Sequence, residues 1–377
     1  MHNQLIKVLI VFGTRPEAIK MAPLIHAFMR QKNNYELKVC VTAQHREMLD
    51  QVLDFFQITP DYDLNLMQPG QDLYQLSARV LTDLKPVLVE FKPDYVFVHG
   101  DTTTSAMAAL AAFYNGAKVC HIEAGLRTYN KYSPFPEEMN RQLTSRLTDL
   151  HFAPTSAAKT NLVSEGVKES DIIVTGNTVI DALLWAKEKL IGFENQEIKL
   201  LKQLIKSDKK LIVITGHRRE NFGDGFLAIC DAIVKLSSRT DVQFIYPVHL
   251  NPNVQDPVYE RLEDLANVDL IQPLGYPAFV WLMIQSYFIL TDSGGIQEEA
   301  PSLRKPVLVM RDTTERPEAV EHGTVKLVGT DEQKIIKEAT ALLEDRNYYL
   351  EMSRNHNAYG NGNACDGILN FLNSKSV

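Results

Sequence analysis

The chain of 377 residues is 45% hydrophobic and 23% charged, a composition typical of a soluble globular protein. Its 39 basic and 47 acidic residues give a net charge of −8, which argues against a surface that binds nucleic acid or an anionic membrane. The length is too great for one ordinary hydrophobic core, so we expect two domains.

The sequence shows no membrane-spanning or secretory segment. No apolar run approaches the roughly 20 residues that cross a bilayer. A predicted strand begins at Leu5, with no leader or cleavage site before it. The four cysteines are scattered and form no Cys-x-x-Cys pair. We therefore expect a cytoplasmic, reduced protein without a metal site.

Short apolar runs rich in Val and Ile alternate with helix-length segments along the chain. The predicted strands are 5–12, 37–42, 94–99, 117–122, 150–153, 171–175, 210–215, 242–248, 267–271, 287–291, 306–310 and 325–328. Continuous apolar strands separated by helices are typical of parallel sheets covered on both faces. A Lys/Glu-rich stretch at 187–210, predicted to be helical and solvated, divides the strands into two sets. We expect two doubly wound α/β domains.

In the first half of the chain, polar residues follow the strands, at the edge where open parallel sheets bind ligands. Arg15 lies in a Gly-Thr-Arg-Pro turn that starts a helix, with Lys20 one turn later, and we interpret Arg15 as an anion clamp. Asp101, at another strand end, is either a functional carboxylate or the N-cap of the next helix. Glu123 follows an almost wholly apolar strand and has no capping role, so we interpret it as functional.

Three further segments contain candidate residues. Glu137 and Glu138 follow the proline-stiffened run Ser-Pro-Phe-Pro. Either both are first-turn acids of a helix, or Glu137 is delivered to the site. His217 follows the first strand of the second half, beside two arginines, where an imidazole can contact a diphosphate or donate a proton. His249 follows the next strand in the same way.

The most informative stretch is the predicted strand 287–291 and the run Asp292–Gly295 that follows it. A buried strand that turns through Ser-Gly-Gly into a helix leaves backbone N–H groups unpaired, and the glycines and helix dipole favour an anion there. Glu299, about one helical turn further on, is placed to accept both hydroxyls of a ribose. The alternative interpretation is an ordinary capped helix with Asp292 or Ser293 as N-cap.

Several long strings resemble the bacterial non-hydrolysing UDP-N-acetylglucosamine 2-epimerases. They are GTRPEAIK, TAQHREMLDQ, VHGDTTT, HIEAGLRT, SPFPEEMNR, TGNTVIDAL, TGHRREN, YPVHLNPNV, TDSGGIQEEAPSL and KPVLVMRDTTERPEA, in family order. The resemblance implies a fold of the glycosyltransferase-B type, with two Rossmann-like doubly wound α/β domains facing a cleft. We place the N-terminal domain at 1–175, with a C-terminal helix at 358–377 packing back on it. The C-terminal, UDP-binding domain is placed at 176–357.

The resemblance also implies an activity and a site. The activity is interconversion of UDP-GlcNAc and UDP-ManNAc, with no cofactor such as NAD and no obligatory metal. Family catalytic residues match Asp101, Glu123, Glu137 and His217. Family substrate-binding residues match Arg15, Lys20, Phe279, Ser293, Gly294, Gly295, Glu299 and Arg316.

Bacterial members of that family are also activated by UDP-GlcNAc at a second site. The matching positions here are Gln44, Arg46, Gln71, Glu138, Arg218 and His249. Leu274 stands where some members carry Gln, so we expect a backbone contact to uracil there. The resemblance further implies a cytoplasmic homodimer that binds UDP-GlcNAc and UDP and supplies UDP-ManNAc for cell-surface polysaccharide.

Three alternatives share the expected fold. A hydrolysing 2-epimerase would release ManNAc and UDP, but the residues of the activator site favour the non-hydrolysing kind. A glycosyltransferase needs an acceptor pocket, with which three carboxylates at strand ends agree poorly. A non-catalytic nucleotide-sugar sensor would keep the phosphate and ribose contacts but would not need the carboxylates.

Overall fold

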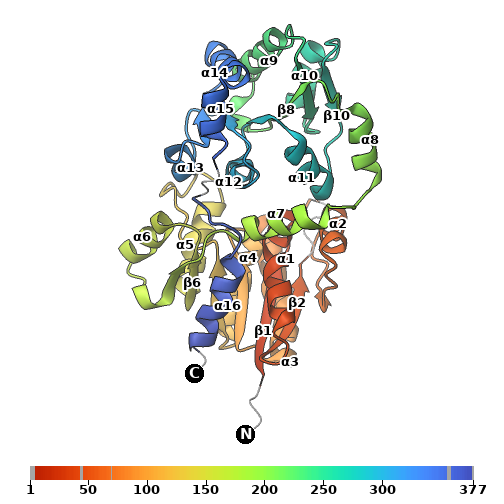
Figure 1. Ribbon diagram of the computed structural model, residues 1–377. Helices are drawn as coiled ribbons and strands as arrows, with labels where there is room; N and C mark the ends of the chain where they lie inside the picture. The colour runs from red at the N-terminus through yellow and green to blue at the C-terminus, as the bar shows by residue number, and fades with distance from the viewer. Residues whose placement is uncertain (1–4, 43–45, 69, 355–357, 376–377) are drawn as a thin grey trace. The chain divides into compact units, whose positions relative to one another are not determined.

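The computed structural model describes residues 5–42, 46–68, 70–354 and 358–375 (Figure 1). Contacts divide the chain into two compact units, Met1–Trp185 with Tyr359–Val377, and Ala186–Ala358. Each unit contains a parallel sheet with helices on its faces, which confirms the expected class of two doubly wound α/β domains. Among the described residues, no helix is both long and apolar enough to cross a membrane.

The first unit alternates strands and helices along most of its length. Its elements are β1 (Ile6–Phe12), α1 (Arg15–Arg30), β2 (Tyr35–Val41), α2 (Arg46–Phe56), β3 (Tyr62–Asp63), α3 (Leu73–Phe91), β4 (Tyr95–His99), α4 (Thr103–Tyr114), β5 (Lys118–Ile122), α5 (Glu137–Leu147), β6 (Leu150–Ala153), α6 (Ser156–Ser164), η1 (Glu169–Asp171), β7 (Ile172–Val174), α7 (Thr178–Lys189) and α16 (Ala364–Lys375). Helix α7 runs across the boundary between the units, and α16 returns to the first unit from the far end of the chain.

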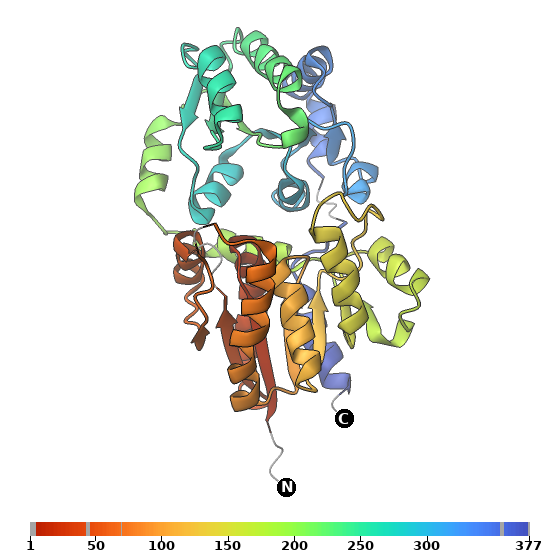
Figure 2. The same cartoon turned by 180° about the vertical axis from the view of Figure 1, so that it is seen from behind.

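The first sheet has the strand order β3-β2-β1-β4-β5-β6-β7. Helices α3 and α4 cover one face, where their apolar side chains pack against β1, β4 and β5 (Figure 2). Helices α1 and α16 contact each other on the opposite face (Figure 1). There Phe97 of β4 makes ring contacts with Phe28 of α1 and with Phe152 of β6, and Phe152 in turn contacts Phe371 of α16. Both faces are therefore buried, which explains the continuous apolar strands.

The second unit repeats this alternation. Its elements are α8 (Gln196–Leu204), β8 (Lys210–Thr215), η2 (Arg219–Asn221), α9 (Asp224–Leu236), β9 (Val242–Pro247), α10 (Pro252–Leu262), β10 (Val268–Ile271), α11 (Tyr276–Gln285), β11 (Phe288–Thr291), α12 (Gly294–Ser302), β12 (Val307–Val309), α13 (Pro317–Glu321), β13 (Val325–Leu327), α14 (Glu332–Glu344) and α15 (Arg346–Met352). Its sheet has the order β10-β9-β8-β11-β12-β13, the arrangement of a dinucleotide-binding fold.

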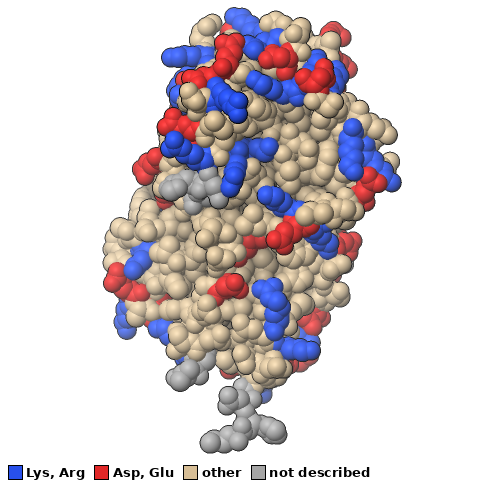
Figure 3. All heavy atoms as spheres, viewed as in Figure 1, with Lys and Arg blue, Asp and Glu red and all other residues tan. Residues whose placement is uncertain are grey.

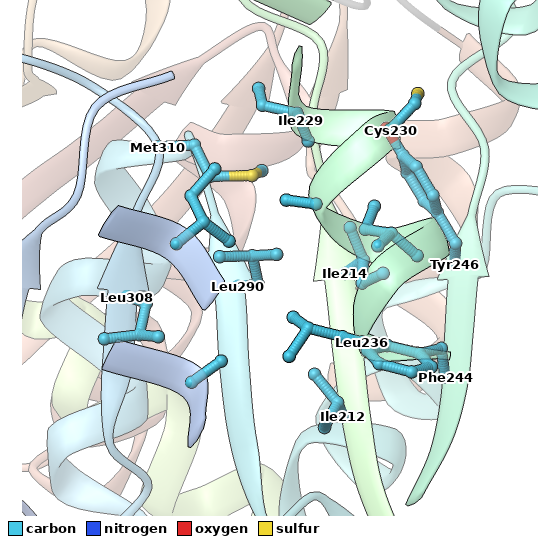
Figure 4. Close-up of a cluster of buried hydrophobic side chains, with 14 of the residues drawn as sticks. Ile212, Ile214, Ile229, Cys230, Leu236, Phe244, Tyr246, Leu290, Leu308 and Met310 are labelled. Atoms are coloured by element: carbon cyan, nitrogen blue, oxygen red, sulfur yellow. The ribbon is translucent and has the colours of Figure 1, made fainter. Parts of the chain in front are cut away.

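One face of the second sheet packs against α9, α10 and α14. Figure 4 shows the centre of this core, where Ile214 and Leu290 from neighbouring strands meet the side chains of α9. Phe244 and Tyr246 of β9 fill the same layer and are buried almost completely. Burying each such side chain contributes roughly 1.5–3 kcal/mol, so this layer fixes where the strands end.

All twelve predicted strands are confirmed within two residues at each end. The sequence did not reveal β3, whose two residues are held in the sheet by pairing with Cys40 and Val41. The stretch 187–210 is helical only in part, because the chain turns at Gly192 before α8 begins. Its predicted solvated character is wrong for Ile198 and Leu201, which are buried.

The surface carries charges of both signs. On the face drawn in Figure 3, Lys and Arg side chains are interspersed with Asp and Glu on both units. Arg239 pairs with Asp241 at 2.9 Å and with Glu344 at 2.6 Å, and both carboxylates are largely exposed. Exposed pairs of this kind contribute little stability, so the core carries most of it.

Two glycines of the first unit, Gly125 and Gly166, differ in how closely other atoms approach them. Gly125 has φ +90°, and a Cβ there would lie 2.2 Å from the carbonyl oxygen of Ala158 in α6. Gly166 has φ +86°, but its Cβ would meet nothing within 4 Å. We expect Gly166→Ala to cost about 1–2 kcal/mol from the left-handed backbone alone. Gly125→Ala should cost clearly more, since α6 must also move.

Urea denaturation of the two variants, followed by circular dichroism, measures this difference. Equal losses of stability would contradict the close approach of Gly125 to α6.

Candidate functional site

The strand order of each sheet reverses once, and loops on either side of that point are the usual ligand site of such folds. In the first unit the reversal lies between β1 and β4, so the loops that begin at Gly13 and Gly100 adjoin it. In the second unit it lies between β8 and β11, next to the loops that begin at Gly216 and Asp292. Nine of the eighteen predicted site residues lie on these loops or the helices that follow.

In the first unit, a buried carboxylate joins the two loops. Glu17 is 3% exposed and accepts hydrogen bonds from the backbone N–H groups of Gly13 (3.0 Å) and Thr14 (2.8 Å). Its other oxygen accepts from the hydroxyls of Thr102 (2.7 Å) and Ser105 (2.9 Å). Burial raises the pKa of Glu17 above its ordinary value. The carboxylate thereby holds the starts of α1 and α4 in one arrangement.

The start of α1 has the expected form. Pro16 lies in the first turn, as predicted, and Arg15 is the first helical residue, partly buried. Gly13 is required by its surroundings, because a Cβ there would lie 2.1 Å from the hydroxyl oxygen of Thr42. The bare glycine backbone lets β2 and the start of α4 approach this turn closely.

Glu123 is held by three neighbours at the end of β5. Its backbone has φ +63°, unusual for a residue with a side chain, and its carboxylate is 7% exposed. One oxygen forms an ion pair with Lys20 and accepts a hydrogen bond from the amide of Asn177 at 2.8 Å. The ring of His99 lies 3.8 Å from the same oxygen, and burial lowers its pKa to about 4, so it is neutral near pH 7. His121 is a core histidine that contacts the carbonyl of Gly100.

Asp101 is joined to Glu138 through one arginine. Arg141 donates to Asp101 at 2.6 Å and to Glu138 at 3.2 Å. The amide of Asn140 also donates to the backbone carbonyl of Asp101 at 2.9 Å. The N-cap of α4 is Thr102, so the capping interpretation of Asp101 is wrong. Its carboxylate is instead fixed from α5.

The two acids at the start of α5 differ in their surroundings. Glu138 is fully buried and accepts from the backbone N–H groups of Thr128 (3.0 Å) and Tyr129 (3.1 Å) and from Gln142 (2.9 Å). Burial would raise its pKa, but these hydrogen bonds outweigh burial and lower it. Glu137 is partly buried, and one of its carboxylate oxygens has no hydrogen-bond partner among the described residues.

In the second unit, His217 lies against Asp292. The fully buried carboxylate of Asp292 accepts from the backbone N–H groups of His217 and Arg218, each at 2.8 Å, and lies 3.5 Å from Nδ1 of the His217 ring. The ring of His249 stacks on that of His217, with centroids 5.4 Å apart and planes 17° apart. Arg218 has a buried Nε without a hydrogen-bond partner in the described structure.

The Ser-Gly-Gly turn begins α12 without a side-chain cap. Ser293 occupies the N-cap position, but its hydroxyl makes no capping hydrogen bond, and Asp292 points its carboxylate to β8 instead. The alternative of an ordinary capped helix is therefore wrong. Arg316 packs against Gly294, where a Cβ would lie 3.2 Å from the guanidinium, and donates to the buried Glu298 at 2.8 Å. The helix start thus combines unpaired N–H groups with a fixed cation.

The remaining candidates are more scattered. Glu299 is 9% exposed and lies in α12, and a Cβ on Gly295 would lie 3.9 Å from its carboxylate. Phe279 is partly buried in α11. Gln71 lines a pocket of about 560 Å³ with apolar neighbours, and its side-chain nitrogen is buried without a hydrogen-bond partner. Gln44 and the side chain of Arg46 lie outside the described residues.

Apart from Gln71 and Phe279, the candidates whose side chains are described fall into two groups, one in each unit. Within the first unit they are Arg15, Lys20, Asp101, Glu123, Glu137 and Glu138; within the second they are His217, Arg218, His249, Ser293, Gly294, Gly295, Glu299 and Arg316. The sequence did not suggest roles for Asn177, Arg141 or Glu17, and it suggested only a capping role for Asp292. The signal that was available is that each lies in a string that resembles the family: Glu17 in GTRPEAIK, Arg141 in SPFPEEMNR and Asn177 in TGNTVIDAL.

Two Rossmann-like units with carboxylates and an uncapped helix start at their strand ends define a fold of the glycosyltransferase-B type. A family profile described as UDP-N-acetylglucosamine 2-epimerase matches residues 27–373. The chain belongs to this family. It is 59% identical over 374 residues to the UDP-N-acetylglucosamine 2-epimerase of Escherichia coli strain K12, covering 98% of this chain and 99% of that relative.

Solved structures agree with this assignment. The UDP-GlcNAc 2-epimerase of Neisseria meningitidis, bound to UDP-GlcNAc, matches with a TM-score of 0.89 and 54% identity, over 98% of this chain and all of that one. The enzyme of Methanocaldococcus jannaschii, in complex with UDP-GlcNAc and UDP, matches with a TM-score of 0.80 and 33% identity, over 98% of this chain and 100% of that one.

A buried arginine beside the second group gives a pH prediction. Arg311 is 5% exposed and donates to Glu315 at 2.8 Å and to Glu220 at 2.5 Å. Burial would raise the pKa of Glu315, but Arg311 outweighs it and holds that pKa at about 2. Because the folded-state pKa is depressed, this stabilisation is present above about pH 4.5 and is lost as the pH falls towards about 2.

We expect Arg311→Met to lower stability at pH 6 and to flatten its dependence on pH between about 4.5 and 2. Urea denaturation across this pH range measures both effects. Glu315→Gln is the matched control, since it removes the titrating group and should flatten the same window. An acid dependence that is unchanged in both variants would show that the pair does not titrate in this way.

Proposed function

We propose that this chain interconverts UDP-GlcNAc and UDP-ManNAc by eliminating UDP and adding it back, in the cytoplasm, to supply UDP-ManNAc for cell-surface polysaccharide. Membership of the family assigns the epimerase activity. The mechanism is supported by one observation above the others. The carboxylate of Glu123 is held at the end of β5 by a strained backbone, a cation and an amide, ready to exchange a proton.

The chemistry explains the need for such a group. The hydrogen on C2 of the sugar is not acidic, because no carbonyl adjoins it. When the bond from C1 to the diphosphate oxygen breaks, the developing positive charge acidifies C2, and loss of its proton gives 2-acetamidoglucal and UDP. Addition of a proton to the other face of C2 and of UDP to C1 gives the epimer. Asp101, Glu123 and Glu137 are the proton-transfer groups that we assign to this cycle.

The departing diphosphate needs positive partners. The unpaired N–H groups at the start of α12 and the guanidinium of Arg316 supply them in the second unit, with His217. In the first unit we assign Arg15 and Lys20 to substrate binding. Glu299 is assigned to the ribose hydroxyls, and Phe279 to the neighbourhood of uracil.

Reaction in deuterium oxide tests the mechanism. Because C2–H breaks, product formed from UDP-GlcNAc should carry deuterium at C2. Glu123→Gln should reduce turnover by ~10²–10⁴, the usual contribution of a positioned acid or base, while UDP binding stays nearly unchanged. Mass spectrometry of the separated products and calorimetric titration with UDP measure these outcomes.

Glu36→Gln, a half-exposed position on β2, is the matched control and should keep full turnover. Product without solvent deuterium would show that the proton is not exchanged with solvent. If scrambling of the bridging oxygen in UDP and release of the free glycal were absent as well, the elimination mechanism would have no support. Release of ManNAc and UDP in place of UDP-ManNAc would instead identify a hydrolysing epimerase.

We also propose a homodimer in which UDP-GlcNAc acts as an activator. Two of the activator candidates are linked to catalytic ones by no more than one intervening side chain. Glu138 shares Arg141 with Asp101, and His249 stacks on His217. A ligand that changed the position of Glu138 or His249 would therefore act on a catalytic candidate through a single neighbour, which is the kind of coupling that activation requires.

Activation predicts an asymmetry between the two directions. The reaction that starts from pure UDP-ManNAc should be slow until a trace of UDP-GlcNAc is added. His249→Ala should reduce this acceleration, because it removes the ring that stacks on His217. Leu250→Ala, an exposed neighbour, is the control. A full initial rate from UDP-ManNAc free of UDP-GlcNAc would exclude activation by this ligand.

A further inference from the structure

Asp292 joins the end of β11 to the loop after β8. Among the described acidic side chains, it is the only one that makes this connection. Asp292 Oδ2 accepts from the backbone N–H groups of His217 and Arg218, each at 2.8 Å, and the amide of Asn221 lies 3.4 Å away. Asn221 also donates to the carbonyl of Met310, just beyond β12, at 3.0 Å. Asp292 therefore lies where three strand ends of the second sheet meet.

The second oxygen of Asp292 is the unusual feature. Oδ1 is buried and accepts no hydrogen bond within the described part of the chain. An unpaired buried carboxylate oxygen costs free energy, so a donor is expected beside it. The ring Nδ1 of His217 lies 3.5 Å from Oδ1, just beyond the usual range of a hydrogen bond.

The orientation of the His217 ring is restricted by two contacts. Its own backbone N–H is bonded to the same carboxylate, and the ring of His249 stacks against it. The ring is nevertheless open to solvent on one side, with 43% of the side chain exposed. One nitrogen is thus directed to Asp292, and the other is left for a ligand.

We propose that Asp292 is the positioning residue of His217. It keeps the proton of the neutral imidazole on Nδ1, so that Nε2 faces the diphosphate of the substrate. When the ring takes up a second proton, that proton is held on Nε2, where it donates to a diphosphate oxygen while Nδ1–H stays on Asp292. This inference rests on the proposed function for the identity of the ligand, but the state of the ring does not depend on it.

The charges around the ring agree with this arrangement. The groups that face His217 are Asp292, Arg218 and His249. Burial lowers the pKa of His217 below its ordinary value, Asp292 acts in the opposite direction, and Arg218 and His249 lower it further. The ring is therefore neutral near pH 7 without ligand, which is the condition under which the choice of tautomer matters.

The first test needs no variant of Asp292. Nitrogen-15 NMR of the wild-type protein, labelled at histidine, reports which ring nitrogen carries the proton, and the spectrum of His217→Gln assigns the signal. We expect the Nδ1–H tautomer near pH 8 without ligand, and protonation of Nε2 on addition of UDP. An Nε2–H tautomer in the free protein would overturn the proposal, whatever the enzyme turns out to catalyse.

The second test distinguishes two possible roles of Asp292: orienting the His217 ring and supporting the loop after β8. Asp292→Asn should lower kcat by about 10²-fold or more and change its pH profile, while UDP affinity falls no further than it does in His217→Gln. His217→Gln with Asp292→Asn should be no slower than His217→Gln alone, because residues that act as a unit do not add. Asp241→Asn, at the other end of the same sheet, is the matched control.

A loss of UDP binding in Asp292→Asn that exceeds the loss in His217→Gln, or additive losses in the double variant, would show that Asp292 only supports the loop. If Asp292→Asn does not fold, the wild-type tautomer decides. If the wild-type protein makes no UDP-ManNAc, the proposed function fails, and the NMR measurement still answers whether Asp292 orients the ring.

Discussion

Loops that carry the candidate residues depend on buried carboxylates, each of which accepts hydrogen bonds from two consecutive backbone N–H groups. Glu17 binds the turn after β1, Glu138 the loop at Thr128, and Asp292 the turn after β8. Turns between a strand and a helix leave such N–H groups without a partner, and burying them unpaired is costly. A carboxylate at this position satisfies both groups and fixes the turn.

The pKa values of Glu17 and Glu138 shift in opposite directions. Burial raises the pKa of Glu17, whereas hydrogen bonds outweigh burial and lower that of Glu138. Removing the donors of such a group leaves a charge buried without compensation, which is more destabilising than removing the group together with its partners. The site residues beside them are therefore held by interactions that tolerate few substitutions.

The fold followed from local properties of the sequence, since Val- and Ile-rich runs and the glycines after them are sufficient to place strands and turns. The start of α12 without a side-chain cap, at Ser293–Gly295, could be predicted because one segment contains all of its parts. The pairing of Asp292 with His217 joins residues far apart in the sequence. Neither segment alone contains that information, so the sequence suggested Asp292 only as one of two possible N-caps in the alternative interpretation. For the same reason β3 was missed, because only its partner β2 makes it a strand.

The first unit is built from two separate parts of the chain. Asp181 in α7 accepts from the backbone N–H groups of Ala364 and Cys365, and Asn177, which holds Glu123, donates its own backbone N–H to the carbonyl of Tyr359 at 2.7 Å. On the ribosome, Asp181 and Asn177 are synthesised before the second unit. Their partners Tyr359, Ala364 and Cys365 are synthesised after it. The second unit is continuous in sequence and can complete its own core first. The carboxylate of Glu123 therefore reaches its final surroundings only near the end of translation.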